Sequence, residues 1–165
     1  MDTEIERLGL QSEAQWCASI MANSEPWVTL GRTYEESLQI ITDPSKEVYI
    51  ARVEGELSGF IILNMKGAFI GYVQTICIGP ESRGRGLGTT LLRFAEERIF
   101  KESPNVFLCV SSFNAEAKRL YERLGYEMIG ELKDYIVRGY SEILMRKTIG
   151  PLKEFSRRSD TAVSG

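Results

Sequence analysis

The segment from Gly79 to Phe100, GPESRGRGLGTTLLRFAEERIF, begins as a turn rich in glycine and arginine and continues as a helix. An apolar run before the turn, residues 68–78, predicts a central strand, and residues 105–110 predict a short buried strand after the helix. Because such a crossover makes the two strands parallel, the chain is predicted to form a sheet with a parallel pair inside it. One face of the helix is apolar at helical spacing, at Leu87, Leu91, Leu92, Ala95 and Ile99.

Two short helices are predicted ahead of that sheet. The segment SEAQWCASIMA has helical spacing, with Ser12 as its expected N-cap. Thr33 and Glu36 stand at the spacing of a capping box and predict the start of a second helix in TYEESLQII. The connection between the two helices, NSEPWVTLGR, is irregular and holds Trp27.

The remaining strands are predicted from β-rich runs. Residues 3–8 predict a short first strand, and residues 47–53 and 57–65 predict a hairpin joined through EGE. Near the end of the chain, residues 126–137 and 141–149 predict a final pair of strands.

A last helix is predicted in NAEAKRLYERLG, between the N-cap Asn114 and the stop signal Gly125. The order of elements predicts one mixed α/β domain with a single central sheet over residues 1–149. Residues 150–165 have little apolar content and are expected to form a flexible tail. One helical stripe holds Ala117, Leu120, Tyr121 and Leu124.

The length and the net charge of the chain are typical of a single globular domain that does not bind nucleic acid. A chain of 165 residues is long enough for one domain with a single buried core. A net charge of −3 gives no support to nucleic-acid binding. The amino terminus lacks the pattern of a secretory signal, and no apolar segment approaches the roughly 20 residues needed to cross a bilayer. The expected location is therefore cytoplasmic, with neither nucleic acid nor membrane as a partner.

The absence of histidine excludes several kinds of catalytic site. Serine–histidine and cysteine–histidine nucleophile systems cannot be built, nor can histidine-ligated metal sites, and no metal is expected. Acid–base chemistry must use Asp, Glu, Tyr, Lys, Cys or water. Cys17, Cys77 and Cys109 lie far apart in apolar segments and are expected to be reduced core thiols.

The glycine turn is suited to hold an anion. A helix start carries unpaired N–H groups and the positive end of the helix dipole, and glycines let a ligand approach the backbone closely. Arg83 and Arg85 add positive charge at the same place. Alternatively, the segment is a plain glycine turn with solvated arginines, because short glycine motifs occur often by chance.

Two nucleotide-binding patterns do not fit this turn. In a P-loop, lysine and then serine or threonine follow the second glycine, but Arg85 and Gly86 follow Gly84 here. A dinucleotide fingerprint needs G-x-G-x-x-G in the first strand–helix unit and an acid roughly 20 residues later, where this chain has SPNVF.

The pattern that fits is Arg-x-x-Gly-x-Gly, formed by Arg83, Gly86 and Gly88. With ICIGPES before it and NAEAKRLYERLGY after it, the sequence resembles the GCN5-related N-acetyltransferase (GNAT) family over about residues 3–149. The resemblance implies an acyl-CoA N-acyltransferase fold: a mostly antiparallel sheet whose fourth and fifth strands are parallel and splayed, with helices on both faces. It also implies acetyl-CoA as cofactor and acetyl transfer to a primary amine of a small molecule or peptide.

The resemblance also assigns cofactor contacts. It implies that the glycine turn holds the pyrophosphate of acetyl-CoA and that the fourth strand binds the pantetheine arm through its main chain. Asn114 is assigned a cofactor contact, beside Ala117. The turn residues are Arg83, Gly84, Arg85, Gly86, Leu87, Gly88 and Thr89, and the strand residues are Ile76, Cys77 and Ile78.

Tyr121 is the residue expected to act as catalytic acid. Asn114, Ala117 and Tyr121 stand at i, i+3 and i+7, hence on one helix face. The resemblance places Tyr121 at the sulfur end of the cofactor, where a phenol can protonate the departing thiolate. The alternative is that Tyr121 simply packs beside Leu120 and Leu124.

A general base is harder to identify. Many relatives carry a glutamate where this chain has Tyr72, and Cys109 replaces another acid in LCVS. Making an amine of pKa about 10.4 neutral near pH 7.5 costs roughly 4 kcal/mol, against less than about 1 for a pKa near 8. A low-pKa amine or a proton path through water is therefore expected. Glutamates 35, 36 and 142 could supply a carboxylate, but the sequence does not place them.

Acceptor recognition is expected from the first two helices and the last strand pair. A non-catalytic acyl-CoA sensor and a generic phosphate-binding module remain as alternative functions, and a homodimer is left open. The residues expected to line the acceptor site are Trp27, Tyr34, Tyr72, Gln74 and Tyr140.

Overall fold

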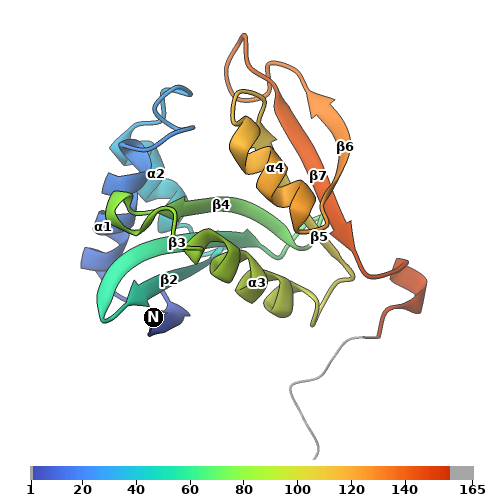
Figure 1. The fold of residues 1–165 in the computed structure, drawn as a ribbon, viewed down its shortest axis with the longest axis horizontal. Helices are drawn as coiled ribbons and strands as arrows, with labels where there is room; N and C mark the ends of the chain where they lie inside the picture. Colours follow the sequence, from blue (N-terminus) through green and yellow to red (C-terminus); the bar gives the residue numbers. More distant parts are fainter. Residues whose placement is uncertain (1, 157–165) are drawn as a thin grey trace, which may run out of the picture.

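A computed structural model describes residues 2–156 and shows one seven-stranded sheet in the order β1-β2-β3-β4-β5-β7-β6 (Figure 1). The mixed α/β class and the predicted order of elements are confirmed. The elements are β1 (Thr3–Arg7), α1 (Gln11–Ala22), α2 (Tyr34–Ile41), β2 (Glu47–Val53), β3 (Glu56–Asn64), β4 (Tyr72–Ile78), α3 (Leu87–Ile99), β5 (Asn105–Ser111), α4 (Ala115–Arg123), β6 (Glu127–Leu132) and β7 (Glu142–Thr148), with short 3-10 helices at Pro80–Ser82 and Leu152–Glu154.

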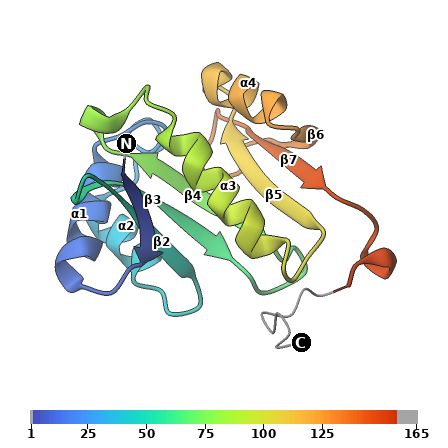
Figure 2. The same cartoon turned by 60° about the horizontal axis from the view of Figure 1, so that its bottom comes forward.

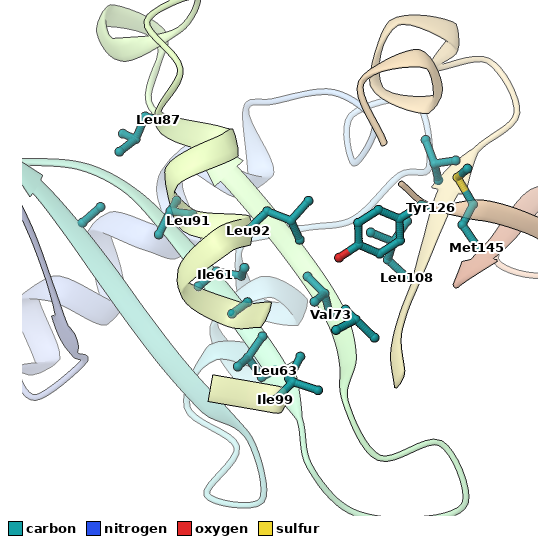
Figure 3. Packing of buried hydrophobic residues seen from close by; sticks show 14 of the residues in the cluster. Ile61, Leu63, Val73, Leu87, Leu91, Leu92, Ile99, Leu108, Tyr126 and Met145 are labelled. Carbon is teal, nitrogen blue, oxygen red and sulfur yellow. The ribbon is translucent and has the colours of Figure 1, made fainter. Parts of the chain in front are cut away.

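Helices cover both faces of the sheet and enclose two cores. The core with α1 and α2 includes Met21, Ile50 and Phe60, all fully buried. The core on the other face contains the predicted apolar stripe of α3, and Figure 3 shows Leu91 and Leu92 of that helix packed beside strand side chains. Residues of α4 pack against this second core as well. The same sheet therefore separates an α1/α2 side from an α3/α4 side.

The parallel pair β4–β5 is short. Its only register pairs are Tyr72 with Phe107 and Val73 with Leu108, whereas the neighbouring antiparallel pairs run along most of their strands. Beyond these pairs the two strands diverge toward their carboxyl ends (Figure 2). The splay implied by the family resemblance is thus confirmed, and it leaves the β5-facing edge of β4 without a strand partner.

A bulge in β4 lies at the start of the splay. Ile62 of β3 pairs with Thr75 and Leu63 with Val73, so Gln74 is an extra residue on β4. A bulge reverses the alternation of side chains and increases local twist. Accordingly Val73 belongs to the α3/α4-side core, while Cys77 belongs to the α1/α2-side core.

The prediction that the central strand begins at residue 68 was wrong. The strand starts at Tyr72, directly after Gly71, whose φ is +92°. A Cβ at Gly71 would lie 2.5 Å from the Ile99 side chain and 2.6 Å from the Asn105 carbonyl, so the chain turns there under the end of α3. Phe69 instead lies in the preceding loop, 60% exposed, with its ring against Phe107.

The helix starts were predicted with mixed success. Thr33 and Glu36 form the expected reciprocal capping box, and the Asn114 side chain accepts the Ala117 N–H. Ser12 is not an N-cap, because it lies inside α1. The start of α1 is held instead by Glu13, whose carboxylate accepts the N–H groups of Gly9 and Leu10.

The carboxyl-terminal part also departs from expectation. Strand β6 ends at Leu132, and residues 133–140 form a turn in which Asp134 has a φ of +53°. Part of the expected flexible tail, Leu152–Glu154, forms a 3-10 turn, and residues 157–165 lie outside the described residues. Within residues 2–156, no helix has the length and apolar character needed to span a membrane.

Candidate active site

A cleft of about 1000 Å³ opens where β4 and β5 separate. Because both faces of the sheet contribute to its walls, the cleft passes between the two strands. The α3/α4 side contributes Gly88, Asn114, Ala117 and Tyr121. The α1/α2 side contributes Trp27, Leu30, Arg32, Tyr72 and Glu142.

On the α3/α4 side, the glycine turn presents free backbone donors. Gly84 and Gly86 have φ values of +75° and +81°, which side-chain-bearing residues rarely adopt. Gly86 is the N-cap of α3, no side chain caps this helix, and its first turn holds no acidic residue. The donors of the first helical turn are therefore open to an anion.

The two arginines of the turn play different parts. The Arg83 guanidinium donates to the Ile78 carbonyl at 3.2 Å and to the Ser24 hydroxyl at 2.9 Å, so it ties the turn to the end of β4 and to the segment after α1. Arg85 is exposed and has no hydrogen bond or ion pair within the described part of the chain. Of the two charges, Arg85 is thus the one free to meet a phosphate.

The side chains of the residues predicted on the fourth strand point alternately to the two faces of the sheet. Ile76 and Ile78 line the cleft. The Cys77 side chain points to the α1/α2-side core and is 2% exposed, and burial raises the pKa of its thiol to about 12. Cys77 can therefore meet a ligand only through its main chain. Beyond Val73 the β4 edge is open to an extended ligand, as an added strand would bind.

Helix α4 brings the predicted acid into the same cleft. Asn114, Ala117 and Tyr121 all line it from one helix face. Burial raises the pKa of the Tyr121 phenol to about 12, and its ring makes an edge contact with Tyr126 at 6.0 Å between centroids. The phenol is therefore protonated at neutral pH and available as a donor.

The predicted acceptor residues divide into two groups. Trp27, Tyr72 and Gln74 line the cleft, and Gln74 Oε1 is buried without a hydrogen-bond partner in the described structure. Tyr34 packs against the α1/α2-side core instead. Tyr140 lies outside the cleft lining, 39% exposed, with its ring 5.2 Å from that of Phe113.

Tyr72 stands where many relatives of the resembled family carry a glutamate, but it does not have the character of a base. Burial raises the pKa of its phenol, and the neighbouring Cys109 thiol raises it further. Burial likewise raises the pKa of Cys109. Both groups are therefore protonated at neutral pH, and neither supplies a proton acceptor.

The three glutamates that the sequence could not place have different surroundings. Glu35 and Glu36 are exposed on α2, and Glu36 is engaged in its capping box. Glu142 is buried in the cleft wall, and its Oε2 has no hydrogen-bond partner in the described structure. Burial raises the pKa of Glu142, while the Ser111 hydroxyl and the charge of Arg32 oppose that shift.

Arg32 is the cleft residue that sequence reasoning missed. Burial lowers the pKa of its guanidinium, opposed by the charges of Glu36 and Glu142 and by Tyr72. It precedes the α2 cap in a loop without periodicity, so nothing in the sequence indicated its position. No cluster of three or more metal-ligating side chains occurs within residues 2–156.

Comparison with known proteins adds independent observations. Residues 11–126 match the model of the acetyltransferase (GNAT) family. An uncharacterized N-acetyltransferase of Methanocaldococcus jannaschii is 33% identical over 101 residues, which cover 60% of this chain and 64% of that protein. The N-alpha-acetyltransferase RimI of Mycobacterium tuberculosis is 30% identical over 159 residues, covering 90% of this chain and 96% of the relative. The chain thus spans just under two thirds of the first relative and nearly all of the second.

Solved structures share the fold at low sequence identity. A GNAT-family protein from Desulfovibrio desulfuricans superposes with a TM-score of 0.75 at 17% identity, over 90% of this chain and 100% of that one. The spermidine N-acetyltransferase of Vibrio cholerae, in complex with CoA and spermine, gives a TM-score of 0.69 at 20% identity, over 88% and 95%.

Proposed function

The chain belongs to the acetyltransferase (GNAT) family, whose members take an acetyl group from acetyl-CoA, and on that premise we propose that it acetylates a primary amine of a small molecule or peptide. The observation that carries the proposal is the cleft between β4 and β5, which has open backbone donors at one end and the Tyr121 phenol in its wall. Residues 1–149 form the proposed catalytic domain.

The cofactor is proposed to lie along the α3/α4 side of the cleft. Its pyrophosphate would meet the N–H groups at the start of α3 and the charge of Arg85, because both favour an anion. Its pantetheine arm would pair with the open β4 edge near Ile76 and Ile78. The thioester would then lie where the strands part, with Tyr121 available to it in the cleft wall.

The reaction needs a polarised carbonyl and a proton donor for the leaving group. A main-chain N–H of β4 would hydrogen-bond the thioester oxygen as negative charge develops on it. The amine nitrogen forms a bond to the carbonyl carbon, the carbon–sulfur bond breaks, and the thiolate takes the Tyr121 hydroxyl proton. The acylated nitrogen releases one proton to solvent, so the products are an amide and coenzyme A, and a proton from bulk water restores Tyr121.

The acceptor is proposed to be an amine of low pKa, such as the α-amine of an amino acid derivative or peptide. Neutral amine attacks, and an α-amine of pKa about 8 costs under about 1 kcal/mol to neutralise near pH 7.5, against roughly 4 for a lysine-like amine. The similarity to the N-alpha-acetyltransferase RimI of Mycobacterium tuberculosis supports the same class of acceptor.

A thiol-release assay with acetyl-CoA and a panel of primary amines tests the proposal. We expect turnover with amino acid amides or short peptides, and a loss of about a hundredfold in kcat for Tyr121→Phe because the thiolate loses its acid. Calorimetry should show that Tyr121→Phe binds coenzyme A like the wild type.

The alternative, a sensor that binds the cofactor without using it, makes the opposite prediction. It would bind acetyl-CoA and leave every amine in the panel unmodified. Failure of the wild type to bind coenzyme A at all would remove both functions.

A further inference from the structure

Glu142 differs from the other buried glutamates of this protein. Glu13 and Glu96 are buried to a similar degree, but their carboxylates are satisfied: Glu13 accepts from Gly9, Leu10 and Arg52, and Glu96 accepts from Tyr126 and Lys147. Hydrogen bonds from the Gly9 backbone lower the pKa of Glu13.

Glu142 is only 7% exposed, but apart from the Ser111 hydroxyl and the charge of Arg32 its carboxylate has little to stabilise it. Its Oε2 has no hydrogen bond within residues 2–156, and burial raises its pKa. Leaving a buried charged group unpaired costs several kcal/mol in general, so folds rarely keep one without use. The neighbours of Glu142 within the described structure therefore leave its Oε2 atom without a structural role.

Strand geometry places Glu142 on the α1/α2 side of the cleft. It is the first residue of β7 and pairs with Ser111 at the carboxyl end of β5. Its neighbour Ile143 lies in the α3/α4-side core, so by alternation Glu142 faces the α1/α2 side. Tyr121 approaches the same cleft from the opposite side. An amine entering from the α1/α2 side would thus meet Glu142 on one flank and the thioester on the other.

The groups around Glu142 affect whether its carboxyl group is charged. Arg32 faces it from the segment before α2, Tyr72 from β4 and Cys109 from β5, and all three interact with it electrostatically. Tyr135, between β6 and β7, lines the cleft beside Tyr72. Arg32 is the only cation among these groups and favours the charged form of Glu142, while the Tyr72 phenol and the Cys109 thiol, whose pKa values burial raises, stay neutral near pH 7.

We propose that Glu142 is the proton acceptor for the attacking amine, an inference that rests on the acetyltransferase function proposed above. As the nitrogen–carbon bond forms, the nitrogen gives one proton to Glu142 Oε2, directly or through one water molecule. The carbon–sulfur bond then breaks and the thiolate takes its proton from Tyr121. The Glu142 proton passes to solvent after the product leaves, so no other co-reactant is needed.

The test compares wild type, Glu142→Gln, Glu142→Asp and the exposed control Glu35→Gln, using acetyl-CoA with amino acid amides and short peptides. We expect Glu142→Gln to lose about a hundredfold in kcat near pH 7. Acetyl-CoA affinity by calorimetry should be unchanged, which also shows that the variant is folded. Glu142→Asp should retain part of the rate, and Glu35→Gln all of it.

The pH profile separates a proton acceptor from an anchor for a cation. Wild-type kcat/KM should fall as pH drops through the Glu142 pKa, because the protonated carboxyl cannot accept a proton. Protonation of the amine lowers kcat/KM in both enzymes, so the expected mark of Glu142 is a further fall at lower pH that Glu142→Gln lacks. The deficit of the variant should shrink at high pH as hydroxide takes over the proton transfer.

Two results would overturn the inference. A Glu142→Gln variant with an increased acceptor KM but wild-type kcat would make Glu142 a binding group, and an unchanged variant would make it a bystander. In both cases the wild type still turns over, so the acetyltransferase proposal stands. A wild type without turnover on any amine overturns both proposals together.

Discussion

At the scale of single residues, the glycines near the start of α3 are there for different structural reasons. Gly84 and Gly86 adopt positive φ values that other residues rarely adopt. Gly88 does not: it lies within α3, and an added Cβ would meet only Ile78 Cγ1, at 4.0 Å. The fold therefore does not require glycine at position 88. Because Gly88 lines the cleft, the absence of a side chain there leaves room for a ligand.

Gly88→Ala should therefore make the protein more stable and a poorer binder. Alanine in a helix is favoured over glycine by about 1 kcal/mol, whereas the new methyl group intrudes on the proposed pyrophosphate and pantetheine path. We expect a higher melting temperature and about tenfold weaker coenzyme A binding by calorimetry. Gly130→Ala, in β6 with open space around it, is the matched control and should bind normally. Unchanged affinity in Gly88→Ala would argue against this location of the cofactor.

Replacing Arg83 and replacing Arg85 should have different effects, the first on stability and the second on coenzyme A binding. Arg83→Ala should lower the free energy of unfolding by about 1–3 kcal/mol, because two hydrogen bonds of a charged donor are lost. Arg85→Ala should leave stability unchanged, but it should weaken coenzyme A binding in a manner that disappears at high salt. Denaturant melts and calorimetry at two ionic strengths measure both effects. Equal loss of stability in the two variants would contradict the assignment.

Glu142 also carries a prediction for stability. Folding raises the pKa of this carboxyl above its unfolded value, so the wild type loses stability as pH rises through the folded pKa. Glutamine does not titrate. Glu142→Gln should consequently melt at a higher temperature than wild type near pH 8, and the difference should vanish near pH 3, where Glu142 is protonated in both the folded and the unfolded wild type. A stability difference that persists at low pH would point to lost packing instead.

At the scale of elements, periodic patterns predicted the helices well and the strand ends poorly. The apolar stripe of α3 and the caps at Thr33 and Asn114 depend on neighbours three or four residues away, which the sequence displays. The start of β4 depends instead on how Gly71 fits under Ile99, a contact that no local pattern records. Phe69 was included in the predicted strand because it belongs to the same apolar run, although it lies in the loop before Gly71.

The candidate site shows the same division. The glycine turn, Tyr121 and the cleft-lining Trp27, Tyr72 and Gln74 were reachable from motifs and order of elements. The separation of Tyr34 and Tyr140 from the cleft, and the burial of Glu142, depend on which way a side chain faces after a loop or at a strand start. Sequence spacing does not determine that orientation.

At the scale of the whole molecule, the short β4–β5 contact leads us to expect that coenzyme A stabilises the fold. A ligand lying between the strands would bridge the two parts of the sheet, and binding at a hundred times Kd adds about 2.7 kcal/mol to stability. We expect coenzyme A at that concentration to raise the melting temperature by about 5–11 °C, and to increase hydrogen-exchange protection in β4 beyond Val73. Protection confined to regions away from β4 and α3 would contradict this binding path.

The bulge at Gln74 has a consequence for how this chain tolerates change in length. Because one extra residue sets which way every side chain before it faces, deleting Gln74 would turn Val73 out of its apolar surroundings and drive the Tyr72 hydroxyl into them. This reversal of side-chain direction would disturb both the packing of the core and the proposed acceptor site. The strand should accept more substitutions at its half-buried positions than at its buried ones, and no single-residue deletion.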